Sequence, residues 1–174
     1  GKAVFMQAPL ACNQDALIRI TNFLKAHPMA PFCVNYYRSF SPFINKIKLM
    51  VQKRYTPLMM HYRMSCFLKE HDNRPEKIVG VGSIITHVCH IIDVFCFITD
   101  SKPVAVSVES MHAKRDDIFP TDNVTAHISF EDGSVCALLF TTIGHEKLGA
   151  ERIEIFFDGK SIVMDDYIGL YGMG

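Results

Sequence analysis

The hydrophobic pattern of the chain changes at Pro103, and this change limits the folds that are open to it. Beyond Pro103, two tight hairpin turns are expected, at EDGS (131–134) and at Asp158-Gly159, because glycine accepts the positive φ that such turns need. Enrichment in β-branched and apolar residues predicts strands at residues 104–111, 124–130, 135–142, 153–157 and 161–164. The second part of the chain is therefore expected to form an antiparallel meander.

Helical signals dominate before Pro103. Asn13 is a good N-cap for a helix that ends near residue 26, and Ser41 followed by Pro42 predicts a second helix that ends near residue 53. The other elements expected here are strands at residues 32–36 and 58–64 and a helix at residues 83–99. Helices in the first part and strands in the second favour an α+β fold, in which helices pack on one face of an open, mostly antiparallel sheet.

Two histidines and an aspartate lie at three-residue intervals in the predicted helix at residues 83–99. His87, His90 and Asp93 would share one face, since helical residues three or four apart are neighbours. The rest of the segment is apolar, which would place this polar row in a cleft or a core. Such a row is typical of proton-transfer sites, although a buried histidine is often only hydrogen-bonded and structural. Imidazole and carboxylate groups at this spacing can also converge on a metal ion, but this is the weaker alternative, because no cluster of Cys or His elsewhere completes the three ligands.

The composition argues against several classes of partner. Eighteen basic and eighteen acidic residues cancel, and the longest basic cluster is Lys114-Arg115, so neither nucleic acid nor an anionic membrane is expected as a partner. The longest apolar stretch is too short to span a bilayer, and no signal peptide is evident. Six cysteines are scattered singly without a C-x-x-C pair, which favours reduced thiols and a cytoplasmic location.

Gly80, Gly82, His90 and Asp93 follow a pattern of glycines, a short apolar stretch and then His-x-x-Asp. This pattern resembles the C-terminal-domain helix of the Gfo/Idh/MocA oxidoreductases. The resemblance covers nearly the whole chain and is greatest to the Gfo/Idh/MocA half of long bacterial proteins that also carry a zinc-alcohol-dehydrogenase-like half. It continues through RSFSP (38–42), DNV (122–124), FEDGS (130–134) and ERIEIFFDGK (151–160).

The resemblance implies a dihydrodipicolinate-reductase-like C-terminal domain at residues 28–174, used for substrate binding and oligomerisation. Residues 1–27 would be the last strand and helix of a dinucleotide-binding Rossmann domain. A homodimer or higher homo-oligomer is implied, paired through the sheet face that the helices leave open. No G-x-G-x-x-G follows a strand, so this piece alone is not expected to bind a dinucleotide, and NAD or NADP is expected in a longer protein of which it is a fragment.

The resemblance also implies roles for individual residues near the cofactor. His90 matches the histidine that moves the hydroxyl proton while a hydride passes between a sugar or cyclitol and the nicotinamide. Gln7-Ala8-Pro9 stands where the family has Glu-Lys-Pro, so Gln7 and Pro9 are expected at the cofactor. Ala8 supplies neither the charge nor the hydrogen bond of the family's lysine.

Four further residues are expected at the substrate. Asp93 belongs to the His-x-x-Asp motif, Thr86 replaces an aspartate that many members carry, and His87 replaces a glutamate of the most similar members. Arg38 could bind a sugar acid or a phosphate by a forked pair of hydrogen bonds, although a solvated surface guanidinium is an equal alternative.

Two hypotheses about function follow from the sequence. In the first, the chain is the C-terminal domain of an NAD(P)-dependent oxidoreductase that acts on a sugar, cyclitol or sugar derivative, and the piece alone is inactive. In the second, it is a catalytically inactive binding or oligomerisation module that has kept the fold. The missing lysine at Ala8 and the missing aspartate at Thr86 keep the second hypothesis open.

Overall fold

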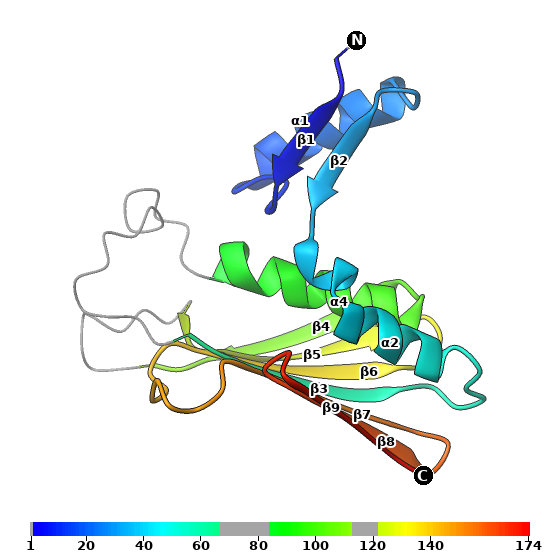
Figure 1. Cartoon of the computed structure of the whole chain (residues 1–174). Coiled ribbons are helices and arrows are strands. Elements are labelled where there is room, and N and C mark those ends of the chain that lie inside the picture. The colour runs from blue at the N-terminus through cyan, green and yellow to red at the C-terminus, as the bar shows by residue number, and fades with distance from the viewer. Residues whose placement is uncertain (1, 67–83, 113–121) are drawn as a thin grey trace.

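The computed structural model describes residues 2–66, 84–112 and 122–174. A seven-stranded sheet, with strand order β4-β5-β6-β3-β7-β8-β9, forms the base of the molecule, and the helices lie on one of its faces (Figure 1). The predicted α+β fold with an open, mostly antiparallel sheet is confirmed. The strands of this sheet are β3 (Met59–Ser65), β4 (Pro103–Ser110), β5 (Val124–Phe130), β6 (Val135–Thr141), β7 (Glu151–Phe157), β8 (Lys160–Asp165) and β9 (Gly169–Met173).

A small β–α–β unit opens the chain and lies on the helix side of the large sheet (Figure 1). Strand β1 (Val4–Gln7) pairs in parallel with β2 (Phe32–Asn35), and α1 (Gln14–Ala26) connects them. The N-cap predicted for α1 is confirmed, since the Oδ1 atom of Asn13 accepts a hydrogen bond from the backbone N–H of Ala16 at 2.9 Å. The unit therefore extends beyond residue 27 to the end of β2.

Two helices supply the layer that covers the large sheet. Ser41 caps α2 (Pro42–Val51) by accepting a hydrogen bond from the N–H of Phe43, as its sequence predicts. Helix α4 (Cys89–Thr99) continues directly from a π-helical segment, η2 (Ile84–Val88). Both helices bury an apolar stripe against the sheet: Ile44, Ile47 and Val51 from α2, and Ile91, Val94, Phe95 and Ile98 from α4.

Strand β3 corrects the prediction of a simple meander. It lies between β6 and β7, parallel to β6 and antiparallel to β7, although it comes from the first part of the chain. The alternation of Met60, Tyr62 and Met64, all buried, explains this central place, because it gives β3 an inner face made of core side chains. A meander built from the second part alone would lack this row of core side chains.

Strand β9 was not predicted. Its sequence, GLYGM, contains two glycines, which weaken the propensity signal of a strand. It forms an edge of the sheet by pairing with β8, where Met164 lies opposite Leu170.

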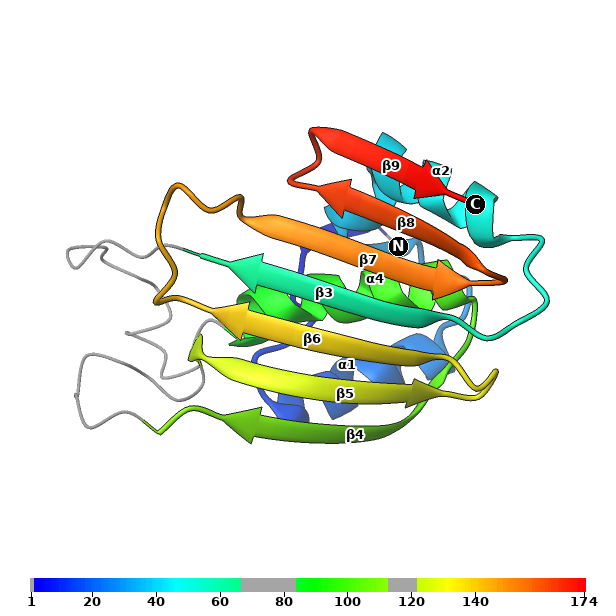
Figure 2. The same cartoon turned by 90° about the horizontal axis from the view of Figure 1, so that it is seen from below.

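The outer face of the sheet is free of helices in the part of the chain that the structure describes (Figure 2). Met59 of β3 and Phe156 of β7 are register partners on this face and are 64% and 45% exposed. Arg152 and Glu154 lie beside them on β7 and form an ion pair at 2.9 Å. Across the described residues, no helix has the length and apolar character that a bilayer crossing needs.

Candidate functional site

The polar residues of the predicted helix take two directions in the structure. The ring of His90 and the carboxylate of Asp93 face η1 (Tyr37–Phe40), the short 3₁₀ turn between β2 and α2. His87 instead stacks on Phe140 of β6, with ring centroids 5.8 Å apart. The π-helical geometry of η2 accounts for the difference, because His87 precedes the regular α-helical spacing on which the prediction of one shared row relied.

His90 is buried, at 6% exposure, between the helix and the tyrosines that precede α2. Its ring centroid lies 4.7 Å from that of Tyr37 and 5.7 Å from that of Tyr36. Its Nδ1 atom has no hydrogen-bond partner among the described residues. Burial lowers the pKa of His90, and the charges of Arg38 and His87 lower it further, while Glu151 acts in the opposite direction. A neutral imidazole at neutral pH results, and it can accept a proton.

This lowered pKa predicts that stability depends on pH through His90. The ordinary value is 6.5, so the folded state binds fewer protons than the unfolded state in the interval below that pH. The stability that neutral His90 contributes is present above pH 6.5 and is lost as the pH falls through the interval. We expect an NMR titration of the ring, assigned by comparison with His90→Gln, to have its midpoint below 6.5. A midpoint at or above that value would contradict the burial argument.

Asp93 lies one helical turn beyond His90. Its Oδ2 atom accepts a short hydrogen bond from the hydroxyl of Ser39 in η1. Burial raises the pKa of Asp93, although the hydrogen bond from Ser39 opposes the shift. A carboxyl group held in this way can exchange its Ser39 partner for a ligand hydroxyl.

Arg38 does not have the solvated guanidinium that was considered from the sequence. The residue is buried, at 5% exposure, and forms a forked ion pair with Glu151, the first residue of β7. Nε donates to Oε2 at 2.9 Å and Nη2 donates to Oε1 at 2.7 Å. That alternative is therefore wrong, and a role for Arg38 in substrate binding stays a prediction.

Two tyrosines complete the polar cluster around Glu151. The hydroxyl of Tyr62, in β3, donates a short hydrogen bond to Oε2 of Glu151 and lies 3.2 Å from the hydroxyl of Tyr167. Burial raises the pKa of Tyr62, and it raises that of Tyr167 to about 12, so both hydroxyls stay protonated at neutral pH. Glu151 and Tyr62 were not among the site residues predicted from the sequence. A charged residue at an inward position of an apolar strand, as in ERIEIFF, was the signal that could have found Glu151.

The remaining predicted site residues lie at different places. The Thr86 hydroxyl lies 3.0 Å from Nδ1 of His87, and Gln7 accepts a hydrogen bond from the side-chain amide of Asn35 at 3.1 Å. Gly80 and Gly82 lie outside the described residues. In the described part of the chain, no group of three or more His, Cys, Asp or Glu side chains is placed to hold a metal ion.

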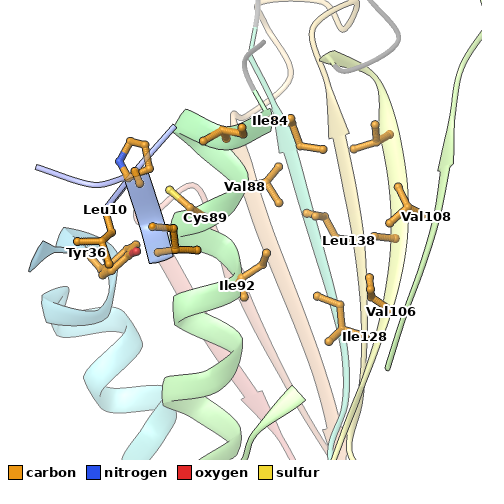
Figure 3. A pocket seen from close by; sticks show the side chains of 16 residues that line it. Leu10, Tyr36, Ile84, Val88, Cys89, Ile92, Val106, Val108, Ile128 and Leu138 are labelled. Carbon is orange, nitrogen blue, oxygen red and sulfur yellow. The ribbon is translucent and has the colours of Figure 1, made fainter. Parts of the chain in front are cut away.

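Pro9 lines an apolar cavity of about 390 Å³. Figure 3 shows side chains of α4 and of the sheet, such as Ile92 and Leu138, pointing into the same space. The lining residues are Pro9, Leu10, Ala11, Leu17, Tyr36, Ile84, Ile85, Val88, Cys89, Ile92, Val106, Val108, Val124, Ala126, Ile128 and Leu138.

The chemistry of this cavity is apolar. Burial raises the pKa of Cys89 to about 11, so its thiol stays neutral. A ligand hydroxyl would find few partners in this cavity, and its burial there would cost free energy. The polar groups at His90 and Asp93 offer the hydrogen-bond partners that this cavity lacks.

The residues present do not fit a dinucleotide. A Rossmann site binds the pyrophosphate through a glycine-rich turn between the first strand and its helix. The loop between β1 and α1, residues 8–13, contains no glycine. Within the described residues, the parallel sheet beside α1 has two strands, β1 and β2. A dinucleotide would need binding groups that the described residues do not provide.

Comparisons with known proteins agree with this architecture. The family profile of the GFO/IDH/MocA C-terminal domain matches residues 56–163. Among curated protein sequences, no match was found.

Solved structures with the same fold include three oxidoreductases. An NAD-binding oxidoreductase from Klebsiella pneumoniae aligns with a TM-score of 0.83 at 15% identity, over 98% of this chain and 50% of that chain. UDP-N-acetylglucosamine 3-dehydrogenase from Acidithiobacillus ferrooxidans gives 0.75 at 16% identity, over 98% and 52%. The myo-inositol dehydrogenase of Lactobacillus casei, in complex with NAD(H) and myo-inositol, gives 0.75 at 17% identity, over 99% and 49%. The chain thus spans about half the length of these structures, and identities this low show the fold alone.

Proposed function

Because the chain belongs to the GFO/IDH/MocA C-terminal domain family, we propose that it is the substrate-binding half of an NAD(P)-dependent oxidoreductase that acts on a sugar, cyclitol or sugar derivative. The observation that carries the proposal is the buried Nδ1 atom of His90, which has no partner among the described residues. A buried polar atom without a partner is costly and is typical of a site that a ligand completes. A substrate hydroxyl supplies the missing donor.

In this proposal His90 moves the hydroxyl proton. Its neutral ring accepts the proton from the substrate hydroxyl, and the nearby Asp93 binds a second hydroxyl in place of Ser39. We also propose that three further residues contribute to substrate binding. Thr86 and His87 would do so as a hydrogen-bonded pair, and Arg38 through its guanidinium near His90. The nicotinamide cofactor, when bound by the longer protein, accepts the hydride.

We further propose that residues 1–27 derive from the dinucleotide-binding domain, with Gln7 and Pro9 near the cofactor. Helix α1 supports this origin, because none of its residues is buried and its apolar Leu17, Ile18 and Phe23 are exposed. Parallel strands normally have helices on both faces, so this unit is suited to a larger α/β domain.

We propose a homo-oligomer that pairs through the outer face of the sheet. Met59 and Phe156 give this face an exposed apolar centre, and the Arg152–Glu154 pair beside them can bind the same pair of a second copy. A cytoplasmic location is part of the proposal, and the six free cysteines are compatible with a reducing compartment.

The alternative function, an inactive binding or oligomerisation module, is favoured by one specific observation. Tyr36 and Tyr37 contact the ring of His90 and leave it 6% exposed, so a substrate reaches Nδ1 only after these side chains shift. Ala8 adds to this, because it cannot replace the charge of the family's lysine.

Calorimetry distinguishes the two functions. We expect the longest native protein that contains this segment to bind NAD(H) or NADP(H), and the 174-residue chain alone to bind neither, because no G-x-G-x-x-G motif follows a strand in its sequence. The isolated chain is the matched control. Absence of binding in both would overturn the oxidoreductase proposal and favour the module.

A further inference from the structure

The ion pair between Arg38 and Glu151 fixes the segment that faces His90. Arg38 is the second residue of η1, whereas Glu151 begins β7 at the centre of the sheet. Both residues are buried, and the forked geometry fixes the direction of the guanidinium as well as its position. The pair therefore binds η1 to the sheet at one defined place.

The residues on either side of Arg38 contact the two polar groups of α4. Tyr37 packs against the ring of His90, and the guanidinium of Arg38 lies 4.9 Å from the centre of the Tyr37 ring. Ser39 donates its hydroxyl hydrogen bond to Asp93. Tyr37, Arg38 and Ser39 thus contact His90, Glu151 and Asp93, respectively. A displacement of Arg38 would therefore disturb the contacts that His90 and Asp93 make with η1.

We propose that Glu151, acting through Arg38, is a positioning residue for His90 and Asp93: it holds η1 so that Tyr37 encloses the His90 ring and Ser39 occupies the Asp93 carboxylate. The role assigned to His90 rests on the proposed function, but the test measures protonation and ring contacts and needs no turnover. A failed test therefore removes the positioning role without affecting the proposed oxidoreductase function. Likewise, a protein without oxidoreductase activity could still show the positioning role.

Several ionisable groups face His90 or its neighbours and bear on the test. They are His87 in η2, Cys89 and Asp93 in α4, Tyr36, Tyr37 and Arg38 beside the ring, and Glu151 with Tyr62 on the sheet. The charge of Arg38 lowers the pKa of His90 and the charge of Glu151 raises it. The geometric and electrostatic effects of the pair can therefore be separated by two substitutions.

Arg38→Lys tests the geometric effect. Lysine keeps the positive charge but cannot form the forked pair, so η1 is released while the charge near His90 is kept. We expect the nuclear Overhauser contacts between Tyr37 and His90 to be lost and the titration midpoint of His90 to rise by about one pH unit as water reaches the ring. Arg54→Lys is the matched control, since Arg54 forms its ion pair with Asp132 and donates to the carbonyl of Thr99, at the end of α4 opposite to His90. Unchanged contacts and midpoint in folded Arg38→Lys, or equal changes in the control, would overturn the proposal.

Glu151→Gln tests the electrostatic effect and covers the case in which Arg38→Lys does not fold. The glutamine oxygen can still accept from Arg38 and hold η1, but the negative charge that raises the pKa of His90 is lost. We expect the Tyr37–His90 contacts to persist and the His90 midpoint to fall. A midpoint that does not fall, or a failure of both variants to fold, would show that the pair serves folding rather than positioning, and the proposal would be abandoned.

Discussion

Replacement of Glu151 by alanine is expected to lower the free energy of unfolding by about 3–5 kcal/mol. The substitution leaves the guanidinium of Arg38 buried without its anion, and it removes the acceptor of the Tyr62 hydroxyl. An unpaired buried charge costs far more than the net value of the pair, because the partner cannot regain water while the fold persists. Urea unfolding followed by circular dichroism measures the loss.

Glu154→Ala is the control for this prediction. Glu154 lies three residues further along β7 and also pairs with an arginine. Its carboxylate and the guanidinium of Arg152 are, however, partly exposed on the outer face. Its loss is expected to cost about 1 kcal/mol or less, the usual range of exposed pairs. Equal costs for Glu151→Ala and Glu154→Ala would mean that the cluster around Glu151 is hydrated rather than buried.

His90→Ala in the longest native protein is expected to lower kcat by about 10²- to 10⁴-fold, the usual contribution of a positioned proton-transfer group. Alanine leaves no group at that place to accept the hydroxyl proton. Steady-state kinetics with a panel of sugars and cyclitols measure the effect, with the substrate concentration varied so that kcat and KM are separated.

His127→Ala controls for the removal of an imidazole. His127 is exposed on β5, so its loss is expected to leave kcat within about twofold of the unchanged protein, since exposed substitutions away from a site are nearly neutral. A His90→Ala protein with unchanged kcat would exclude the proton-transfer role. A native protein without turnover on any member of the panel would favour the inactive module.

The helices and most strands could be predicted because their signals are local. Asn13 and Ser41 cap their helices as expected, and the apolar alternation of β5 gives its bounds of Val124–Phe130. The place of β3 could not be predicted, because its pairing with β6 and β7 depends on residues far away in the sequence. The glycines of β9 concealed a strand that exists through its pairing with β8.

The candidate site was predicted in part, because only some of its contacts depend on local sequence signals. Regular helical spacing placed His90 and Asp93 together, whereas the π-helical segment before them turned His87 toward the sheet. The partner of Arg38 lies at Glu151, more than a hundred residues away, and no local pattern links the two. The contacts that give His90 its surroundings therefore became visible only in the folded chain.

The central place of β3 has a consequence for the order in which the chain folds. Met59 lies beside Val135 on one side and Phe156 on the other, so the middle of the sheet joins segments that are synthesised at very different times. Non-local pairing of this kind slows folding, because a long loop must close before its contacts form. During synthesis, β3 with its inward row of Met60, Tyr62 and Met64 has no strand partner until β6 has left the ribosome, and its second edge stays unpaired until β7 follows.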